Sequence, residues 1–296
     1  MDKHEKIRKI AKDLNVIDDA LFQKMAEDIG FCEEMISTIL GQNVMIKKIV
    51  PQNSIKNLQG RSVILDALCT LESGKECNVE VQKANDDDHE KRVRYNASCI
   101  TANITEPGTR FEKVPDVISI FISKFDIFGD GKTVYHVERV VRETGKVREN
   151  GFYEIYVNTK VKDGTDIAEL MKIFSENDAY DFEKFPKISR RKSQFKLEKG
   201  GEGNMCEAIE NFGKECAKEA VMESAYNLFK NGASYEMVRA SINLLSDDEL
   251  KESSSKRFSN SFTKETISFW ASFIPRPPII ETGITFVSGS VSLIFC

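Results

Sequence analysis

The sequence predicts a mixed α/β fold, and three observations support this prediction. Apolar residues recur at helical spacing between Val16 and Gly41. Residues 117–122 are a run of β-branched and aromatic side chains interrupted only by Ser119, which is typical of a buried strand. A helix-like segment, residues 86–104, lies between this run and the apolar strand that contains Val81. Strands and helices that alternate in this order indicate a layered α/β domain.

Two helices are expected before residue 42. The apolar positions of the first share one helical face: Leu21, Phe22, Met25 and Ile29. Asp18 or Asp19 is placed to cap its N-terminus. Residues 31–40 repeat the pattern, and Gly41 is a stop signal for the second helix.

The central part of the chain alternates further strands and helices. The expected strands are residues 44–50, 61–71, 76–83, 117–122, 134–140 and 152–158. The expected helices are residues 86–104 and 166–174. Residues 53–60 are expected to be a polar connection. Glu106-Pro107-Gly108 is expected to end the helix at residues 86–104.

The composition changes after residue 180. Residues 181–203 are charged and contain several glycines, so we expect a linker between a domain at 14–180 and a helical accessory region at 204–252. That region contains two helix-like segments, residues 206–230 and 234–245. Residues 253–296 form an atypical tail. A disordered or loosely packed tail, a membrane-inserted tail and a frameshifted terminus are the three interpretations left open, although the polar residues among its apolar ones make a spanning helix a poor fit.

Composition argues against several kinds of site and location. Seven cysteines, an odd number, are scattered without a CxxC pair, which favours reduced thiols in the cytoplasm over disulfides or a zinc site. Three histidines lack metal-ligand spacing, so a zinc centre or a Ser-His-Asp triad is poorly supported. No secretory signal is visible, and no stable membrane association is expected.

The net charge of −5 does not indicate a general polyanion binder, so a nucleic-acid enzyme would have to concentrate its basic residues locally. Lys91, Arg92 and Arg94 form one such cluster. A second basic cluster, residues 187–196, is read as a solvated surface with nucleic-acid binding as the alternative. Arg92 and Arg94 are two positions apart on a helix and therefore face different directions, so one can reach phosphate while the other pairs with nearby acids.

Two neighbouring strands carry the candidate chemistry. In the second, period-two alternation places Asn78, Glu80 and Gln82 on one face. Asp66, on the first strand, joins that face only if the turn has the right length. A two-residue loop would pair position 67 with 80, whereas a three-residue loop at 72–74, with glycine last, pairs 71 with 75 and therefore 66 with 80.

Opposed carboxylates of this kind suit a divalent cation. Opposite residues have Cβ atoms about 4.5–5.5 Å apart, so Asp66 and Glu80 could share one ion. Mg²⁺ (or Mn²⁺) commonly binds one or two carboxylates together with waters and phosphate, and such an ion can activate water against a phosphodiester. Gln82 can donate or accept a hydrogen bond there but is not a useful base. Taken alone, the D…ExQ pattern is weak, since an exposed strand edge or a surface ion cluster would explain it equally well.

Further motifs in the same order make the pattern specific. They are D-x-x-F at 19–22, L-G at 40–41, L-D at 65–66, N-V-E-V-Q at 78–82, K-R-x-R-Y at 91–95, P-G-x-x-F at 107–111 and F-D-x-F-G at 125–129. Over roughly residues 14–175 this order resembles the PD-(D/E)XK nuclease family transposases, also described as recombination-promoting nucleases. The resemblance implies a restriction-endonuclease-like core, a mixed central sheet flanked by helices, here with C-terminal helices added.

The resemblance also implies roles for individual residues. Asp66 and Glu80 would be metal ligands, Gln82 would stand where many relatives have a catalytic lysine, and Asp19 would be an auxiliary acid, with helix capping as its alternative role. Lys91, Arg92 and Arg94 would contact DNA. Two departures from the family pattern, Gln23 and Asn96, are not expected to touch the proposed ligands.

The sequence therefore predicts a Mg²⁺-dependent DNA endonuclease associated with mobile-element recombination. The alternative is a catalytically inactive DNA-binding or regulatory protein on the same fold, and RNA is left open as the substrate. Homo-oligomerisation is also left open.

Overall fold

The computed structural model describes residues 5, 10–55, 62–85, 88–197, 201–255, 286–287 and 290–291. The chain divides into two compact units, the first made of residues 1–57 and 62–209 and the second of residues 58–61 and 210–296. The first unit contains the hairpin with Asp66 and Glu80.

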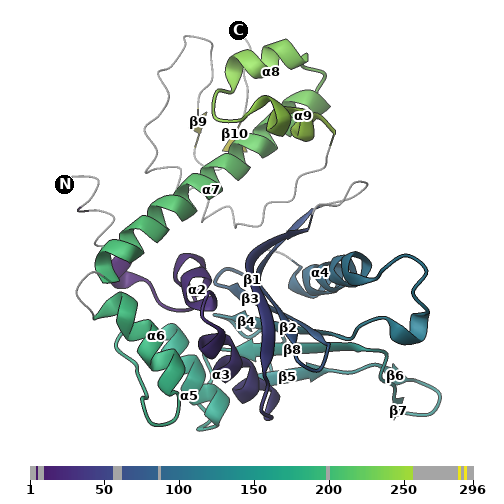
Figure 1. The fold of residues 1–296 in the computed structure, drawn as a ribbon, viewed down its shortest axis with the longest axis vertical. Helices are drawn as coiled ribbons and strands as arrows, with labels where there is room; N and C mark the ends of the chain where they lie inside the picture. The colour runs from purple at the N-terminus through teal and green to yellow at the C-terminus, as the bar shows by residue number, and fades with distance from the viewer. Residues whose placement is uncertain are drawn as a thin grey trace. The chain divides into compact units, whose positions relative to one another are not determined.

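A six-stranded mixed sheet forms the centre of the first unit (Figure 1). Its strands in spatial order are β1 (Ile46–Ile55), β2 (Val63–Leu71), β3 (Glu76–Gln82), β4 (Val117–Ser123), β8 (Phe152–Asn158) and β5 (Val134–Val137). Neighbours β1, β2 and β3 run antiparallel, β3, β4 and β8 run parallel, and β5 returns antiparallel to β8. This arrangement confirms the expected mixed central sheet flanked by helices, consistent with a restriction-endonuclease-like fold.

Helices cover both faces of this sheet. Helix α4 (His89–Ile104) packs on one face, where its Val93 contacts Phe121 of β4 and Tyr156 of β8. Helices α2 (Asp19–Ala26) and α3 (Ile29–Leu40) lie on the other side, and Cys32 of α3 contacts Cys69 of β2 there (Figure 1). Helices α5 (Asp166–Ser175) and α6 (Pro186–Lys196) complete that layer by packing on α3.

The sequence features that end and begin these helices act as expected at several points. Gly41 ends α3 in the left-handed conformation, at φ 63°. The Asp28 side chain caps α3 by accepting from the Phe31 amide. Asp88 does the same for α4, accepting from the Lys91 amide, while residues 86–87 of the expected helix lie outside the described part.

Three expected boundaries were wrong. Strand β1 continues to Ile55, through Gln52 at φ 50°, so the polar connection does not begin at residue 53. The expected strand at 134–140 is divided into β5 and β6 (Val140–Val141), and β6 pairs with β7 (Lys146–Val147). The expected charged linker at 181–203 is also wrong, because this segment is largely helical.

The charged segment 181–203 contains helix α6 and the start of α7 (Gly201–Lys230). Lys192 is fully buried, and its ammonium donates to the carbonyl oxygens of Ile173, Glu176 and Ala179 at 3.0, 2.6 and 3.0 Å. Because these acceptors belong to the end of α5 and the loop after it, a residue that looked like a solvated surface charge anchors α6 to the domain.

Helices follow one another from residue 201 to residue 255, and the helix expected at 234–245 ends earlier, at Ser241. Helices α8 (Tyr235–Ser241) and α9 (Asp247–Ser255) follow α7. Their common core is small and apolar: Ala225, Val238, Ile242, Leu245 and Leu250. Of the tail at 253–296, the structure describes the end of α9, β9 (Phe286–Val287) and β10 (Ser290–Val291), so the interpretations of that segment mostly concern residues outside the described part. No helix in the described ranges is long and apolar enough to cross a membrane.

Candidate active site

The turn between β2 and β3 fixes the register that the candidate site needs. The Leu71 amide donates to the Lys75 carbonyl at 2.9 Å, and Gly74 adopts φ 82°. From there the ladder pairs Thr70 with Glu76 and continues to Ala67 opposite Val79. The three-residue loop is thus confirmed. The paired ladder ends at Ala67 and Val79, one position before Asp66 and Glu80, so the register is the predicted one but these two residues are not themselves a ladder pair.

The two strands part immediately beyond this ladder. The Val81 amide donates to Oδ2 of Asp66 at 2.9 Å, which takes the place of a backbone partner. Strand β2 stays paired with β1, where Leu65 lies opposite Asn53, while β3 stays paired with β4. The fork between β2 and β3 therefore opens at Asp66 and Glu80. Inside the fork, the Val81 amide of β3 holds the Asp66 carboxylate.

Glu80 is held from its own strand and from α4. Its side chain is 3% exposed, and Oε1 accepts from Asn78 Nδ2 at 3.0 Å and from Asn96 Nδ2 at 3.2 Å. The other oxygen, Oε2, lies 3.4 Å from Nη2 of Arg92. The polar face predicted for β3 is thus confirmed, and α4 covers it. The expectation that Asn96 would not touch a proposed ligand was wrong.

Gln82 makes contacts at both ends of its amide. Its Nε2 donates to the Ala84 carbonyl at 3.0 Å, and its Oε1 accepts from Arg92 Nη1 at 3.1 Å. Arg92 is therefore the arginine that pairs with the nearby acid, as the helical spacing of Arg92 and Arg94 indicated.

Asp19 lies beside the fork, at the start of α2. Burial, followed by the neighbouring Asp18 carboxylate, raises the pKa of Asp19 to about 7. Arg92 and Lys83 oppose this rise, and Glu80 adds to it. Asp18, not Asp19, is the N-cap residue, and its side chain makes no capping bond. It accepts instead from the Asn15 amide and pairs with Lys83, so the N-cap position expected at Asp18 or Asp19 is confirmed at Asp18, while the side-chain capping bond is absent.

The carboxylates at the fork repel one another. Burial raises the pKa of Asp66 well above its usual range, and Glu80 and Asp19 raise it further. Burial also raises the pKa of Glu80, although Arg92 and the two asparagine amides lower it. Such mutual destabilisation marks a place where added positive charge is favourable.

Protein side chains at the fork supply only some of the ligands that a magnesium-like ion needs. Among the residues that the structure describes, no three His, Cys, Asp or Glu side chains are arranged to hold a metal by themselves. Asp66 and Glu80 supply the one or two carboxylates that Mg²⁺ commonly takes, which leaves positions for water and phosphate. The residues present are compatible with that ion.

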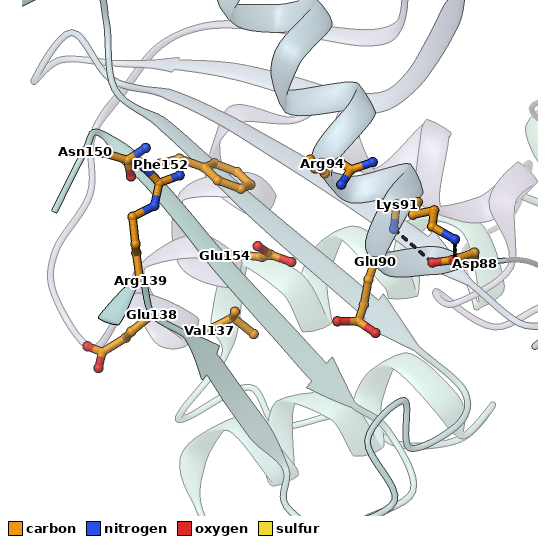
Figure 2. A pocket seen from close by; sticks show the side chains of 10 residues that line it. All are labelled: Asp88, Glu90, Lys91, Arg94, Val137, Glu138, Arg139, Asn150, Phe152 and Glu154. Carbon is orange, nitrogen blue, oxygen red and sulfur yellow. Dashed lines mark hydrogen bonds and ion pairs between the residues drawn. The ribbon is translucent and has the colours of Figure 1, made fainter. Parts of the chain in front are cut away.

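Lys91 and Arg94 are not brought to the fork. They line a pocket of about 540 Å³ on the other side of α4's N-terminal turns, opposite Arg139 and Phe152 (Figure 2). Four acidic side chains line the same pocket: Asp88, Glu90, Glu138 and Glu154. Lys91 pairs with Asp88. The predicted basic cluster is thus divided, with one arginine at the fork and two cations in a pocket of mixed charge.

The sequence placed Asn78 on this face but did not predict its bond to Glu80, and it did not predict the roles of Asn96, which donates to Glu80, and Lys83, which pairs with Asp18. One signal was available. Arg92 and Asn96 are four positions apart, so a helix over this segment sets both on one face. The sequence alone does not show that this face of α4 packs on β3.

Comparison with known proteins gives one match. Residues 29–169 match the family model of the PD-(D/E)XK nuclease family transposases. The match includes Asp66, Glu80, Gln82 and α4, while Asp19 lies before it. No significant match to a curated protein or to a solved structure was found.

Proposed function

We propose that this chain, whose residues 29–169 belong to the PD-(D/E)XK nuclease family transposases, is a divalent-metal-dependent DNA endonuclease that acts in recombination. The observation that carries the proposal is the fork where β2 and β3 separate beyond the Ala67–Val79 pair: the Asp66 carboxylate is held there by the Val81 amide, and Glu80 is buried beside it.

Asp66 and Glu80 would hold the ion, Mg²⁺ or Mn²⁺. When bound, it would supply positive charge to the scissile phosphate and lower the pKa of a bound water. Asn78 and Asn96 fix Oε1 of Glu80, and the Val81 amide fixes Oδ2 of Asp66, so each carboxylate is oriented before substrate arrives.

The reaction would be hydrolysis of one phosphodiester bond. The oxygen of water forms a bond to phosphorus while one P–O ester bond breaks, and the leaving oxygen takes a proton from solvent. Gln82 cannot accept the proton of the attacking water, because an amide is not a useful base. That proton passes to solvent, and Asp19 contributes as an auxiliary acid beside the fork.

Substitution of the two carboxylates tests the proposal directly. Asp66→Ala and Glu80→Ala should each abolish nicking of supercoiled plasmid in Mg²⁺ or Mn²⁺, whereas Asp130→Ala, at an exposed acid outside the site, should cleave like the wild type. Undiminished cleavage by both site variants would refute the assignment.

The rival function is a DNA-binding or regulatory protein without turnover. It is favoured by the contacts of Gln82, whose amide is engaged by Ala84 and Arg92, and by the position of Arg92 on Glu80. Tight duplex binding without cleavage in either metal would establish this rival. The same assay with RNA identifies the polymer that is cut.

The place of action that we propose is the cytoplasm. The thiols of Cys32, Cys69 and Cys77 lie buried together against the sheet without forming a disulfide, which suits a reducing compartment.

A further inference from the structure

Arg92 is the basic side chain that α4 directs to the carboxylates at the fork. Its side chain is 20% exposed, so the guanidinium lies between the buried site and solvent. Lys83, the other cation near these acids, pairs with Asp18. Arg92 is thus placed to meet a group that enters from outside.

Two of the contacts that the guanidinium makes, to Gln82 and to Glu80, differ in length. The 3.1 Å bond from Nη1 to Gln82 has an ordinary length for a neutral acceptor. The 3.4 Å approach of Nη2 to Glu80 is long for a charge-assisted bond, which is usually about 2.7–2.9 Å. Gln82 therefore fixes the guanidinium, and Glu80 holds it only loosely.

A phosphate that approaches Asp19, Asp66 and Glu80 meets negative charge. Positive charge at the same place must offset that repulsion, most of all when charge on the phosphate oxygens changes during reaction. A planar guanidinium matches two phosphate oxygens at once and remains protonated at any pH of interest. The loose contact with Glu80 is the one that such a ligand can replace at little cost.

We propose that Arg92 is a catalytic residue that binds the scissile phosphate, and that Gln82 is a positioning residue whose amide oxygen holds Arg92 in place. The inference rests on the proposed nuclease function and deepens it. As water bonds to phosphorus and the P–O ester bond breaks, Arg92 donates hydrogen bonds to the non-bridging oxygens and neither gains nor loses a proton. Gln82 then acts through Arg92 and does not contact the water.

A double-mutant cycle tests both roles. Arg92→Ala, Gln82→Ala and the double variant are compared in single-turnover cleavage of a labelled duplex at saturating enzyme. Removal of one electrostatic donor typically costs about 10²–10³-fold in rate, which we expect for Arg92→Ala. Loss of an orienting partner typically costs about 10–100-fold, which we expect for Gln82→Ala. The double variant should be no slower than Arg92→Ala alone, since the two residues act as one unit.

Two controls separate chemistry from folding and affinity. Arg110→Ala removes an exposed arginine that pairs only with Glu112 in its own turn and should cleave at the wild-type rate. Arg92→Lys keeps the charge and should retain more activity than Arg92→Ala. Duplex affinity in EDTA, measured by fluorescence anisotropy, should change less than about tenfold in Arg92→Ala, because one phosphate contact is a small part of binding.

The outcomes are distinct. An active wild type with an equally active Arg92→Ala variant overturns the role of Arg92 and leaves the proposed function intact. Losses that multiply in the double variant overturn the positioning role of Gln82. A wild type that cleaves no nucleic acid overturns the proposed function and this inference together.

Discussion

Replacement of Asn96 by alanine should loosen Glu80 and lower stability at the same time. Both residues are buried, and Asn96 donates to Oε1 of Glu80 at 3.2 Å. A hydrogen bond to a charged group contributes about 1.5–3 kcal/mol. After the substitution, Oε1 would keep only the bond from Asn78. We therefore expect the free energy of unfolding to fall by about 1.5–3 kcal/mol.

Thermal denaturation followed by circular dichroism measures this loss. Each kcal/mol lowers the midpoint by about 2–4 °C in a domain of 150–250 residues, so Asn96→Ala should lower it by about 3–12 °C. Asn103→Ala is the matched control, since Asn103 lies on the same helix, is exposed, and donates only to the Cys99 carbonyl one turn earlier. Its midpoint should remain near that of the wild type.

The same variant should also bind metal less tightly. Loss of a partner that orients a ligand typically lowers metal affinity about 10–100-fold, which calorimetric titration with Mn²⁺ would detect. Equal midpoints and equal Mn²⁺ affinities in Asn96→Ala and Asn103→Ala would refute the claim that Asn96 holds Glu80.

Three further predictions concern other residues of the first unit. The pKa of Asp19 is raised from 3.8 to about 7 in the folded chain, so the folded state binds the extra proton between these values and stability should fall as pH rises through this window. Asp19→Asn should reduce that fall in urea denaturation at pH 5 and pH 8, because Asp66 and Glu80 still contribute to it, and an unchanged pH profile would contradict the prediction. Lys91→Ala combined with Arg94→Ala should weaken duplex binding and reduce the slope of log affinity against log salt by about 1–2, with an unaltered slope as the contrary result. Gly74→Ala should cost about 1–2 kcal/mol, because φ is 82° and a Cβ there meets no atom within 4 Å; a midpoint equal to that of the wild type would exclude this cost.

The hairpin could be predicted because its information is local. Period-two alternation predicted the polar face of β3, and the glycine at position 74 predicted the turn length. Together they predicted the register of β2 and β3 that extends towards Asp66 and Glu80, without knowledge of any other element. The helices α2 and α3 were likewise visible from apolar spacing and from Gly41.

The remaining features depend on contacts between distant segments. The charge of α6 indicated a linker, yet Lys192 is buried because carbonyl groups at the end of α5 satisfy its ammonium. Asn96 and Gln82 carried no distinctive local pattern. Their roles follow from α4 packing on the polar face of β3, a pairing that single-sequence periodicity does not encode.

Gln82 and Asn96 meet in one network around Glu80. The resemblance implied a lysine in many relatives at position 82 and a different residue at position 96; here Gln82 and Asn96 each make a hydrogen bond within the Glu80–Arg92 group. Lys83 and Asp18 form an ion pair and compensate each other. Among the described residues, this leaves three carboxylates and the Arg92 guanidinium at the fork. With all three carboxylates ionised, the remaining charge is two negative units, which one divalent cation would balance. A lysine at position 82 would have cancelled part of that negative charge from within β3. With glutamine there, the positive charge comes from Arg92 on α4. The side-chain amides that orient Glu80 are neutral and add no charge.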